Sequence, residues 1–322
     1  MRGEYILGID TSNYTTSLGL VDLAGHVIAN IKRPLPVREG ERGLRQSDAL
    51  FAHTKNLPSA MQELRKAIGE GRLLAVGVSS RPRNVDGSYM PCFLSGVAAA
   101  NAVAATSNIP LYTFSHQCGH VMAALVSCEN EALQKAPAFG AFHVSGGTTE
   151  VLSVRVADKG FFAECVGGTK DLNAGQIIDR VGVALGLTFP CGPALEALAM
   201  QYTGKIPKRK PSLDGCYVNL SGLENMALSL YRETDDAPQV AAFVLHHIAD
   251  ALCGMARAYN ERYGEGTILF AGGVMCNGII RRKLQSATRA AFAIPAMSAD
   301  NAVGIASLAA KAYREEFISE KK

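Results

Sequence analysis

The sequence predicts an α/β protein made of two similar halves, each a strand meander followed by helices. A strand, a polar turn and a returning strand open the chain at residues 4–22, and the same order recurs at 138–156, about 135 residues later. Hydrophobic residues make up 48% of the 322 residues, which allows a large core and favours two domains. The 32 glycines indicate many tight turns and close backbone approaches.

The first half alternates apolar runs of strand length with two helical patterns. Strands are expected at 4–10, 18–22, 26–31, 73–79 and 110–114. The helix expected at 45–68 has apolar residues at helical spacing, and Pro58 is expected to kink or split it. A helix of small residues is expected at 92–106, able to pack closely on a sheet.

The second half repeats this plan with more helices. Two strands at 138–156 flank a Ser/Gly/Thr turn, and further strands are expected at 161–167, 267–273 and 291–295. Helices are expected at 173–186, 192–202, 237–262, 277–290 and 302–316. We therefore place an N-terminal lobe at 1–115 and a C-terminal lobe at 116–301, with the last helix packing back on the first lobe.

Composition narrows the class of protein and its location. The net charge of +3 permits an anionic partner without requiring one. The eight cysteines include no C-x-x-C pair, which disfavours a disulfide framework or a thiolate zinc site and favours a reducing, cytoplasmic location. No signal peptide and no run of about 18 apolar residues is present, so no membrane partner is expected.

Three turns rich in Gly, Ser and Thr follow expected strands. They are "DTSN" (10–13), "SGGTT" (145–149) and "AGGVMCNG" (271–278). Such turns expose backbone N–H groups that bind phosphate, although most turns of this kind are only turns. Two of them lie in duplicated positions, which favours nucleotide binding. The chain has no G-x-x-x-x-G-K-[ST] loop, so it is not a P-loop protein.

Three aspartates stand where a carboxylate has either a structural or a functional role. We take Asp10, at the end of the first strand, as the candidate catalytic residue; the alternative is that it caps the turn. Asp179 lies among apolar residues of a helix and needs a partner, either a ribose hydroxyl or Arg180 or a helix N–H. Asp300 precedes the last helix, where the alternative role is an N-cap.

Two histidines in "FSHQCGH" are four residues apart. Residues i and i+4 share one helix face, so His116 and His120 can hold one metal ion together. Taken alone, such a pair is more often an ordinary pair of surface or core histidines. The motif lacks the Glu of H-E-x-x-H sites, which disfavours a peptidase.

Taken in order, the motifs resemble the tRNA threonylcarbamoyladenosine synthase family, once described as O-sialoglycoprotein endopeptidases. The resemblance runs over nearly the whole chain, from "GIDTS" to "DNAVGIASLA". The motifs that carry it are "FSHQCGH", "VSGGT", "DLNAGQIIDRVGVALGLTFPCGP", "LSGLE", "AGGVMCN" and "SADN". It implies a duplicated actin-like ATPase (ribonuclease H-like) fold, with two lobes and a nucleotide cleft between them.

The resemblance also implies the ligands and the reaction. One divalent metal, Fe or Zn, would be held by His116, His120 and Asp300. ATP or an AMP-containing adenylate would be bound by His143, Val144, Ser145, Gly146, Gly147, Asp179, Gly192 and Asn277, together with Gly272 and Gly273 of the third turn. The expected reaction moves a threonylcarbamoyl group from its adenylate to a tRNA adenosine, with tRNA and a small actin-like protein of the same pathway as partners.

Several positions depart from the family pattern near the reacting end. Tyr14 and Thr15 stand where the family has Asp and Glu, Thr148 replaces a His, and Leu172–Asn173 replaces an Asp–Ala pair. The loop "SSRPRNVDGSYMP" replaces a Gly-Pro-Gly loop. These changes indicate a divergent paralogue with weak or altered transfer. The alternatives are another acceptor, ATP hydrolysis as a switch, or a non-catalytic scaffold. The basic run "GKIPKRKP" (204–211) is either a tRNA surface or a solvated loop.

Overall fold

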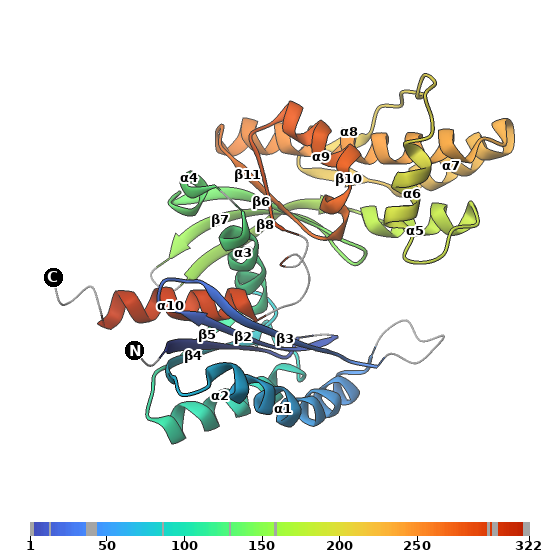
Figure 1. Ribbon diagram of the computed structural model, residues 1–322. Coiled ribbons are helices and arrows are strands. Elements are labelled where there is room, and N and C mark those ends of the chain that lie inside the picture. Colours follow the sequence, from blue (N-terminus) through green and yellow to red (C-terminus); the bar gives the residue numbers. More distant parts are fainter. Residues whose placement is uncertain are drawn as a thin grey trace. The chain divides into compact units, whose positions relative to one another are not determined.

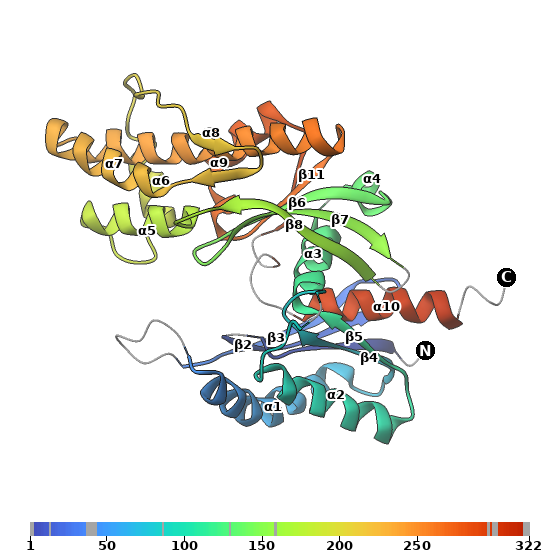
Figure 2. The same ribbon diagram turned by 180° about the vertical axis from the view of Figure 1, so that it is seen from behind.

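The structure is a computed structural model, and its contacts divide the chain into two compact units (Figures 1 and 2). It describes residues 3–12, 14–36, 44–85, 87–128, 130–157, 160–294, 297 and 302–317. Unit 1 comprises Met1–Ser127, Arg155–Ala163 and Ala299–Lys322; unit 2 comprises Cys128–Val154 and Glu164–Ser298. The contacts thus group the histidine helix with unit 1, a division that differs from the lobes 1–115 and 116–301. The lobe boundary itself stays a prediction.

Unit 1 is built on a five-stranded sheet in the order β3-β2-β1-β4-β5. Its strands are β1 (Glu4–Asp10), β2 (Thr15–Asp22), β3 (Val27–Pro34), β4 (Arg72–Arg81) and β5 (Leu111–Ser115). The first three pair antiparallel, as the expected meander requires, and β4 and β5 continue the sheet parallel to β1. Parallel strands end at the same edge of a sheet, so the carboxyl ends of β1 and β5 both lie there.

Two helices cover one face of this sheet. They are α1 (Gln46–Ile68) and α2 (Phe93–Ser107), and Leu57 and Leu64 of α1 join Ile9 and Val78 in one buried cluster. The expected kink at Pro58 stays a prediction, whereas the expected split was wrong, because α1 runs unbroken through it. The reason is tertiary packing: buried residues on both sides of the proline hold the two parts of α1 against the same sheet.

The other face of the sheet carries glycines where a helix backbone lies directly on it. Gly8, Gly19 and Gly77 pair in register across β2, β1 and β4. A Cβ added at these glycines would lie 2.3, 2.6 and 2.8 Å from the nearest atom of residues 302–309. Helix α10 (Val303–Phe317) therefore packs against a row of glycines. Larger side chains at these three strand positions would prevent this close packing.

Helix α10 also fixes α3 (His116–Ser127), the helix that carries both histidines. A Cβ added at Gly304 would lie 1.9 Å from the backbone oxygen of Gly119, so the two helices cross at very short range. The sheet, α10 and α3 are thus packed in succession, and this packing sets the position of the histidine face.

Unit 2 is built on a seven-stranded sheet in the order β12-β11-β6-β7-β8-β10-β9. Its strands are β6 (Ala138–Val144), β7 (Thr149–Ala157), β8 (Gly160–Thr169), β9 (Ser212–Asp214), β10 (Tyr217–Asn219), β11 (Ile268–Ala271) and β12 (Ala290–Phe292). The strand–turn–strand expected at 138–156 corresponds to β6 and β7. Strands β6 and β11 are parallel neighbours, so the turns that follow them lie at one edge.

One long buried helix, α8 (Ala237–Tyr263), packs against α5 (Ala174–Ala184), α6 (Gly192–Ala199), α7 (Ser221–Thr234) and α9 (Gly278–Ala287) of unit 2. Unit 2 also contains α4 (Glu131–Gln134) and the 3₁₀ turn η1 (Gly273–Cys276). Helix α7 was missed from the sequence, although Leu223, Ala227 and Leu230 recur at helical spacing within it.

Helix α8 is long and apolar enough to cross a membrane by length and composition, the single such helix in the described ranges. Its most apolar 18-residue window is 83% buried inside the protein, as in the core helix of a globular domain. All eight cysteines are free thiols in this structure.

A carboxylate fastens α7 to the sheet of unit 2. Asp171, just beyond β8, accepts hydrogen bonds from the backbone N–H groups of Leu172 and Leu220 at 2.6 and 2.8 Å and from the Ser221 hydroxyl at 2.6 Å. Partial burial alone would raise the pKa of Asp171, but these hydrogen bonds outweigh it and hold the pKa at about 2.

We expect Asp171→Asn to lower the free energy of unfolding at pH 7 by about 1–2 kcal/mol, a value discounted for the exposure of the side chain. Because the folded-state pKa is depressed, the stabilisation is present above the unfolded value of about 3.9 and is lost as pH falls toward about 2. Urea unfolding at pH 7 and pH 3 measures this difference, which should shrink at pH 3. The exposed Asp214→Asn serves as the control, and an equal loss in both variants would contradict the prediction.

Candidate metal and nucleotide site

The first Gly/Ser/Thr-type turn is tied to the start of α2 through its polar side chains. The Thr11 hydroxyl donates to the carbonyl oxygen of Cys92 at 3.0 Å and accepts from the N–H of Gly96 at 3.1 Å. Asp10 Oδ1 accepts from the N–H of Ser12 at 2.8 Å, which is the turn-capping role that the sequence left open. One carboxylate oxygen of Asp10 thus holds the turn, and the other faces α3.

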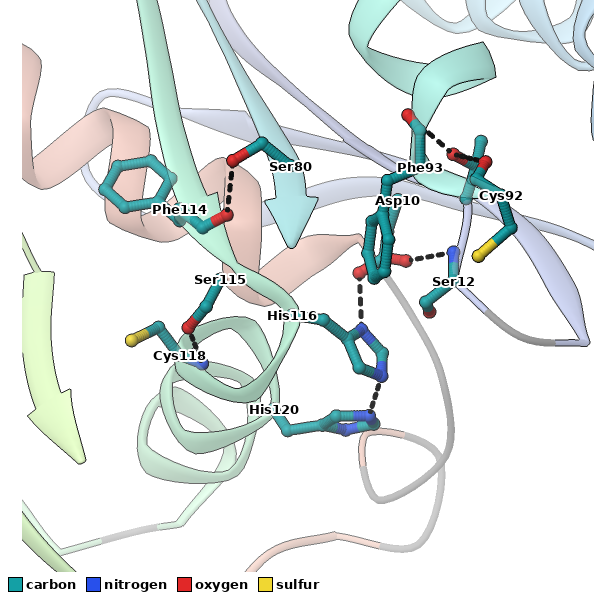
Figure 3. Close-up of polar contacts among 11 residues, drawn as sticks. Asp10, Ser12, Ser80, Cys92, Phe93, Phe114, Ser115, His116, Cys118 and His120 are labelled. Carbon is teal, nitrogen blue, oxygen red and sulfur yellow. Dashed lines mark hydrogen bonds and ion pairs between the residues drawn. The ribbon is translucent and has the colours of Figure 1, made fainter. Parts of the chain in front are cut away.

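The two histidines lie on one face of α3, directly after β5 (Figure 3). His116 Nδ1 lies 2.7 Å from Asp10 Oδ2, and His116 Nε2 lies 2.8 Å from His120 Nε2. The two rings stand edge to face with their centroids 4.2 Å apart. The side chains of His116 and Asp10 are 13% and 2% exposed, so this chain of contacts is largely shielded from water. The structure therefore brings together Asp10 and the histidine pair, 106 residues apart in sequence.

The contact with Asp10 assigns the protonation of His116. A carboxylate only accepts hydrogen bonds, so the imidazole must donate its proton from Nδ1. The Nε2 atom of a neutral ring then carries a lone pair directed toward His120. Metal-binding histidines commonly show this arrangement, in which the nitrogen away from the ion donates to a carboxylate.

The donor set fits a divalent transition metal. Two nitrogens each about 2.0–2.1 Å from one ion at angles of about 90–109° would be about 2.9–3.4 Å apart, close to the 2.8 Å between the two Nε2 atoms. Imidazole nitrogens suit Zn and Fe. Within the ranges described above, no group of three or more His, Cys, Asp or Glu side chains is arranged to hold an ion. The third expected ligand, Asp300, lies outside the described residues.

The second turn joins β6 to β7 in unit 2 and exposes two glycines. The N–H of Ser145 donates to the carbonyl oxygen of Thr148 at 2.7 Å, and the N–H of Thr148 donates to the Ser145 hydroxyl at 3.1 Å. Gly146 and Gly147 are exposed, and a Cβ added at either would meet no atom of the described residues within 4 Å. The turn therefore leaves open space beside its backbone, which suits a ligand's close approach.

The start of α5 abuts this turn. A Cβ added at Gly175 would lie 2.6 Å from Gly146, so glycine is required there for the helix to approach. The N–H of Gly175 donates to the carbonyl oxygen of Ser145 at 3.2 Å. The helix N-terminus, with its partial positive charge, is thus placed beside the exposed glycines.

The third turn follows β11 and packs against the end of β6. Gly272 has φ of +104°, and a Cβ there would lie 2.2 Å from the carbonyl oxygen of Val144. Only glycine fits this position, whereas Gly273 is exposed and has open space around its Cα. The structure thus brings the second and third turns together at one edge of the sheet, as the parallel pairing of β6 and β11 requires.

Three predicted nucleotide residues have structural contacts of their own. Asn277 is buried, and its Oδ1 accepts from the N–H groups of Ile279 and Ile280 at 3.1 Å each, the N-cap of α9. The side chain of Val144 is fully buried in the core, so its main chain is the part that faces the turn. His143 is half-buried at the end of β6.

Asp179 and Gly192 meet where α5 faces the start of α6. Asp179 Oδ1 accepts from the N–H of Cys191 at 2.8 Å, so its partner is a backbone N–H at a helix start. Arg180, the other partner considered, pairs instead with Glu224 at 3.0 Å. Gly192 is the first residue of α6, and a Cβ added there would meet no atom within 4 Å.

One polar contact near the third turn could not be found from the sequence. Glu196 of α6 accepts through Oε1 from the N–H of Gly278 at 2.7 Å, across 82 residues. No local spacing connects these two residues, and the contact holds the start of α9 against α6.

The candidate metal ligands described here belong to unit 1, and the predicted nucleotide-binding residues belong to unit 2.

Solved structures similar to this chain identify the fold. HypF from T. kodakarensis aligns with a TM-score of 0.61 at 14% identity, over 97% of this chain and 48% of that chain. A ROK family transcriptional regulator aligns with a TM-score of 0.57 at 13% identity, over 99% and 81%. The activator of 2-hydroxyisocaproyl-CoA dehydratase from Clostridium difficile aligns at 0.52 and 13%, over 98% and 97%. These neighbours confirm the α/β actin-like ATPase fold.

Sequence relatives extend over the full chain. A protein of Streptococcus suis is 29% identical over 330 residues, covering 98% of this chain and 94% of the relative. A protein of Thermus thermophilus is 29% identical over 331 residues with the same coverage. Both are named tRNA N6-adenosine threonylcarbamoyltransferase. The sequence profile of that family matches residues 34–307. With most of its length matched, this chain belongs to the tRNA N6-adenosine threonylcarbamoyltransferase family.

Proposed function

We propose that this enzyme moves a threonylcarbamoyl group from its adenylate to the N6 amine of an adenosine in tRNA. The observation that carries the proposal is the family match over residues 34–307. In this transfer the amine nitrogen bonds to the carbamoyl carbon, and the bond from that carbon to the phosphate oxygen breaks. AMP leaves with the bonding electron pair, and the amine proton passes to a base.

His116 and His120 are the proposed holders of one divalent metal, Fe or Zn, with Asp300 as the third ligand. The 2.8 Å separation of the two Nε2 atoms supports this assignment. When bound, such an ion acts as a Lewis acid toward a carbonyl oxygen. Asp10, expected from the sequence to be catalytic, is assigned a positioning role here, because its carboxylate holds the Nδ1 proton of His116.

The adenylate is assigned to the two turns of unit 2. The open space beside Gly146, Gly147 and Gly273 supports phosphate contacts through backbone N–H groups. His143, Val144, Ser145, Gly192, Gly272 and Asn277 surround these turns in the proposal. Asp179 is assigned to the ribose, since only its Oδ1 has a partner among the described residues. The expected position of the nucleotide between the lobes stays a prediction.

A second function is favoured by one feature of the first turn. Tyr14 and Thr15 occupy the positions of the family's acidic pair, and the side chain of Tyr14 is exposed. A chain that keeps the metal-binding and nucleotide-binding residues but lacks these acids would act on another acceptor, hydrolyse ATP or serve as a scaffold. The small actin-like partner protein remains a prediction from the resemblance, and the cytoplasmic location remains a prediction from the cysteine pattern.

The proposal is tested by transfer to tRNA with the synthetic adenylate, followed by nucleoside mass spectrometry. We expect the unaltered chain to form threonylcarbamoyladenosine. Gly273→Val should weaken ATP binding at least about tenfold in calorimetry, because its side chain enters space that the protein leaves open. Gly266→Val, at a glycine before the start of β11 with no positive φ and with open space among the described residues, should bind as the unaltered chain does. Equal ATP affinity in Gly273→Val would show the nucleotide assignment to be wrong.

A further inference from the structure

The basic run at 204–211 forms one wall of a pocket in unit 2. The pocket has a volume of about 280 Å³. Lys205, Lys208 and Arg209 line it from the loop between α6 and β9, and this loop passes beside α8 in Figures 1 and 2. Helix α8 contributes two histidines and Asp250, and α9 contributes Lys283. The loop therefore borders a hollow that is partly open to solvent.

The charge of the pocket is strongly positive. Four of its residues are cationic, and Asp250 is its one carboxylate. Asp250 Oδ1 already pairs with Lys283 Nζ at 2.6 Å. Lys205, Lys208 and Arg209 are exposed, and over the described part of the chain no carboxylate pairs with them. Three positive charges therefore remain for an anion.

A buried polar atom on the pocket wall has no partner. His247 is 5% exposed, and its Nδ1 makes no hydrogen bond within the described residues. An orphaned buried nitrogen is costly and uncommon in folded proteins. Burial also lowers the pKa of both His246 and His247, which keeps the rings neutral at pH 7. The two imidazoles therefore add no positive charge to the pocket.

We propose that this pocket binds a backbone phosphate of the tRNA substrate. The inference rests on the proposed function, which supplies the nucleic acid. Lysine and arginine side chains that have no carboxylate partner among the described residues surround one pocket and match a phosphate group. Among the described residues, no Phe, Tyr or Trp lines the pocket, so these residues provide no platform on which a base would stack. Contacts of this kind position an RNA without reading its sequence.

The test measures the affinity for full-length unmodified tRNA as a function of salt. Lys208→Glu and Arg209→Glu should each weaken binding about tenfold at low salt and reduce the slope of log K against log salt by about 1. The matched control is Lys210→Glu, an exposed residue of the same run that does not line the pocket. An equal loss of tRNA affinity in Lys210→Glu would overturn the pocket assignment, because it would show that the positive charge of the whole run attracts the tRNA.

A second arm adds inorganic phosphate. Phosphate that binds the pocket while all variants keep full tRNA affinity would overturn the assignment to RNA.

Failure of the pocket and failure of the proposed function give different results. If the pocket is correct, the variants raise the KM for tRNA, keep kcat at saturating tRNA and bind ATP as before. If the unaltered chain modifies tRNA and the variants match it, the pocket assignment alone is wrong. If the unaltered chain neither binds nor modifies tRNA, the proposed function fails, and the phosphate site on tRNA falls with it.

Discussion

Replacing His120 with alanine is expected to reduce bound divalent metal to well below one ion per chain and to lower transfer at least about 100-fold. Loss of a residue that merely orients a metal ligand typically costs 10–100-fold, and loss of a ligand itself should cost at least the upper end of that range. His120 Nε2 lies 2.8 Å from His116 Nε2, so removing the ring leaves one imidazole where the proposal needs two. The measurement is metal content by mass spectrometry after loading with Zn or Fe and dialysis.

A graded series strengthens this test. Asp10→Asn keeps the shape of the side chain but weakens its hold on the Nδ1 proton of His116, so metal affinity should fall about 10–100-fold. His26→Ala removes an exposed histidine that pairs with Asp22 and should leave the metal content unchanged. Full metal content in the His120→Ala variant would show that the pair is an ordinary histidine contact.

Restoring the acidic pair of the first turn is expected to raise transfer by about 10²-fold or more, since a positioned acid or base typically contributes 10²–10⁴-fold. The change is Tyr14→Asp together with Thr15→Glu. Neither side chain belongs to the buried core, so the fold should tolerate both. The turn is held by its main chain, in which the N–H of Leu35 donates to the carbonyl oxygen of Tyr14 at 2.7 Å.

The matched control is Tyr14→Asn with Thr15→Gln, which has similar shape and no charge. Mass spectrometry of the modified nucleoside, with the partner proteins supplied, measures transfer by the unaltered chain, the acidic variant and the control. A gain in the acidic variant alone supports a transferase frame that has lost its acids. High activity in the unaltered chain would show that the acids are dispensable. No transfer in any form, with ATP and metal still bound, would favour another acceptor or a scaffold.

Local pattern was enough for most of the elements. The repeated meander at 4–22 and 138–156 corresponds to β1–β2 and β6–β7, because alternation and short apolar runs depend on neighbouring residues alone. Helix α7 was missed although Leu223, Ala227 and Leu230 recur at helical spacing, and its packing against α5 and α8 stabilises it. Pro58 does not split α1, since buried neighbours on both sides outweigh its intrinsic preference.

The sequence by itself determined that His116 and His120 share a helix face, because i and i+4 neighbours follow from helix geometry alone. It also determined the family, because ordered motifs do not depend on three-dimensional contacts. Only the tertiary structure decided that Asp10 holds His116, since strand order brings together residues 106 positions apart. The same holds for Gly8, Gly19 and Gly77, whose shared role depends on cross-strand register, a property set by pairing and not by any one strand.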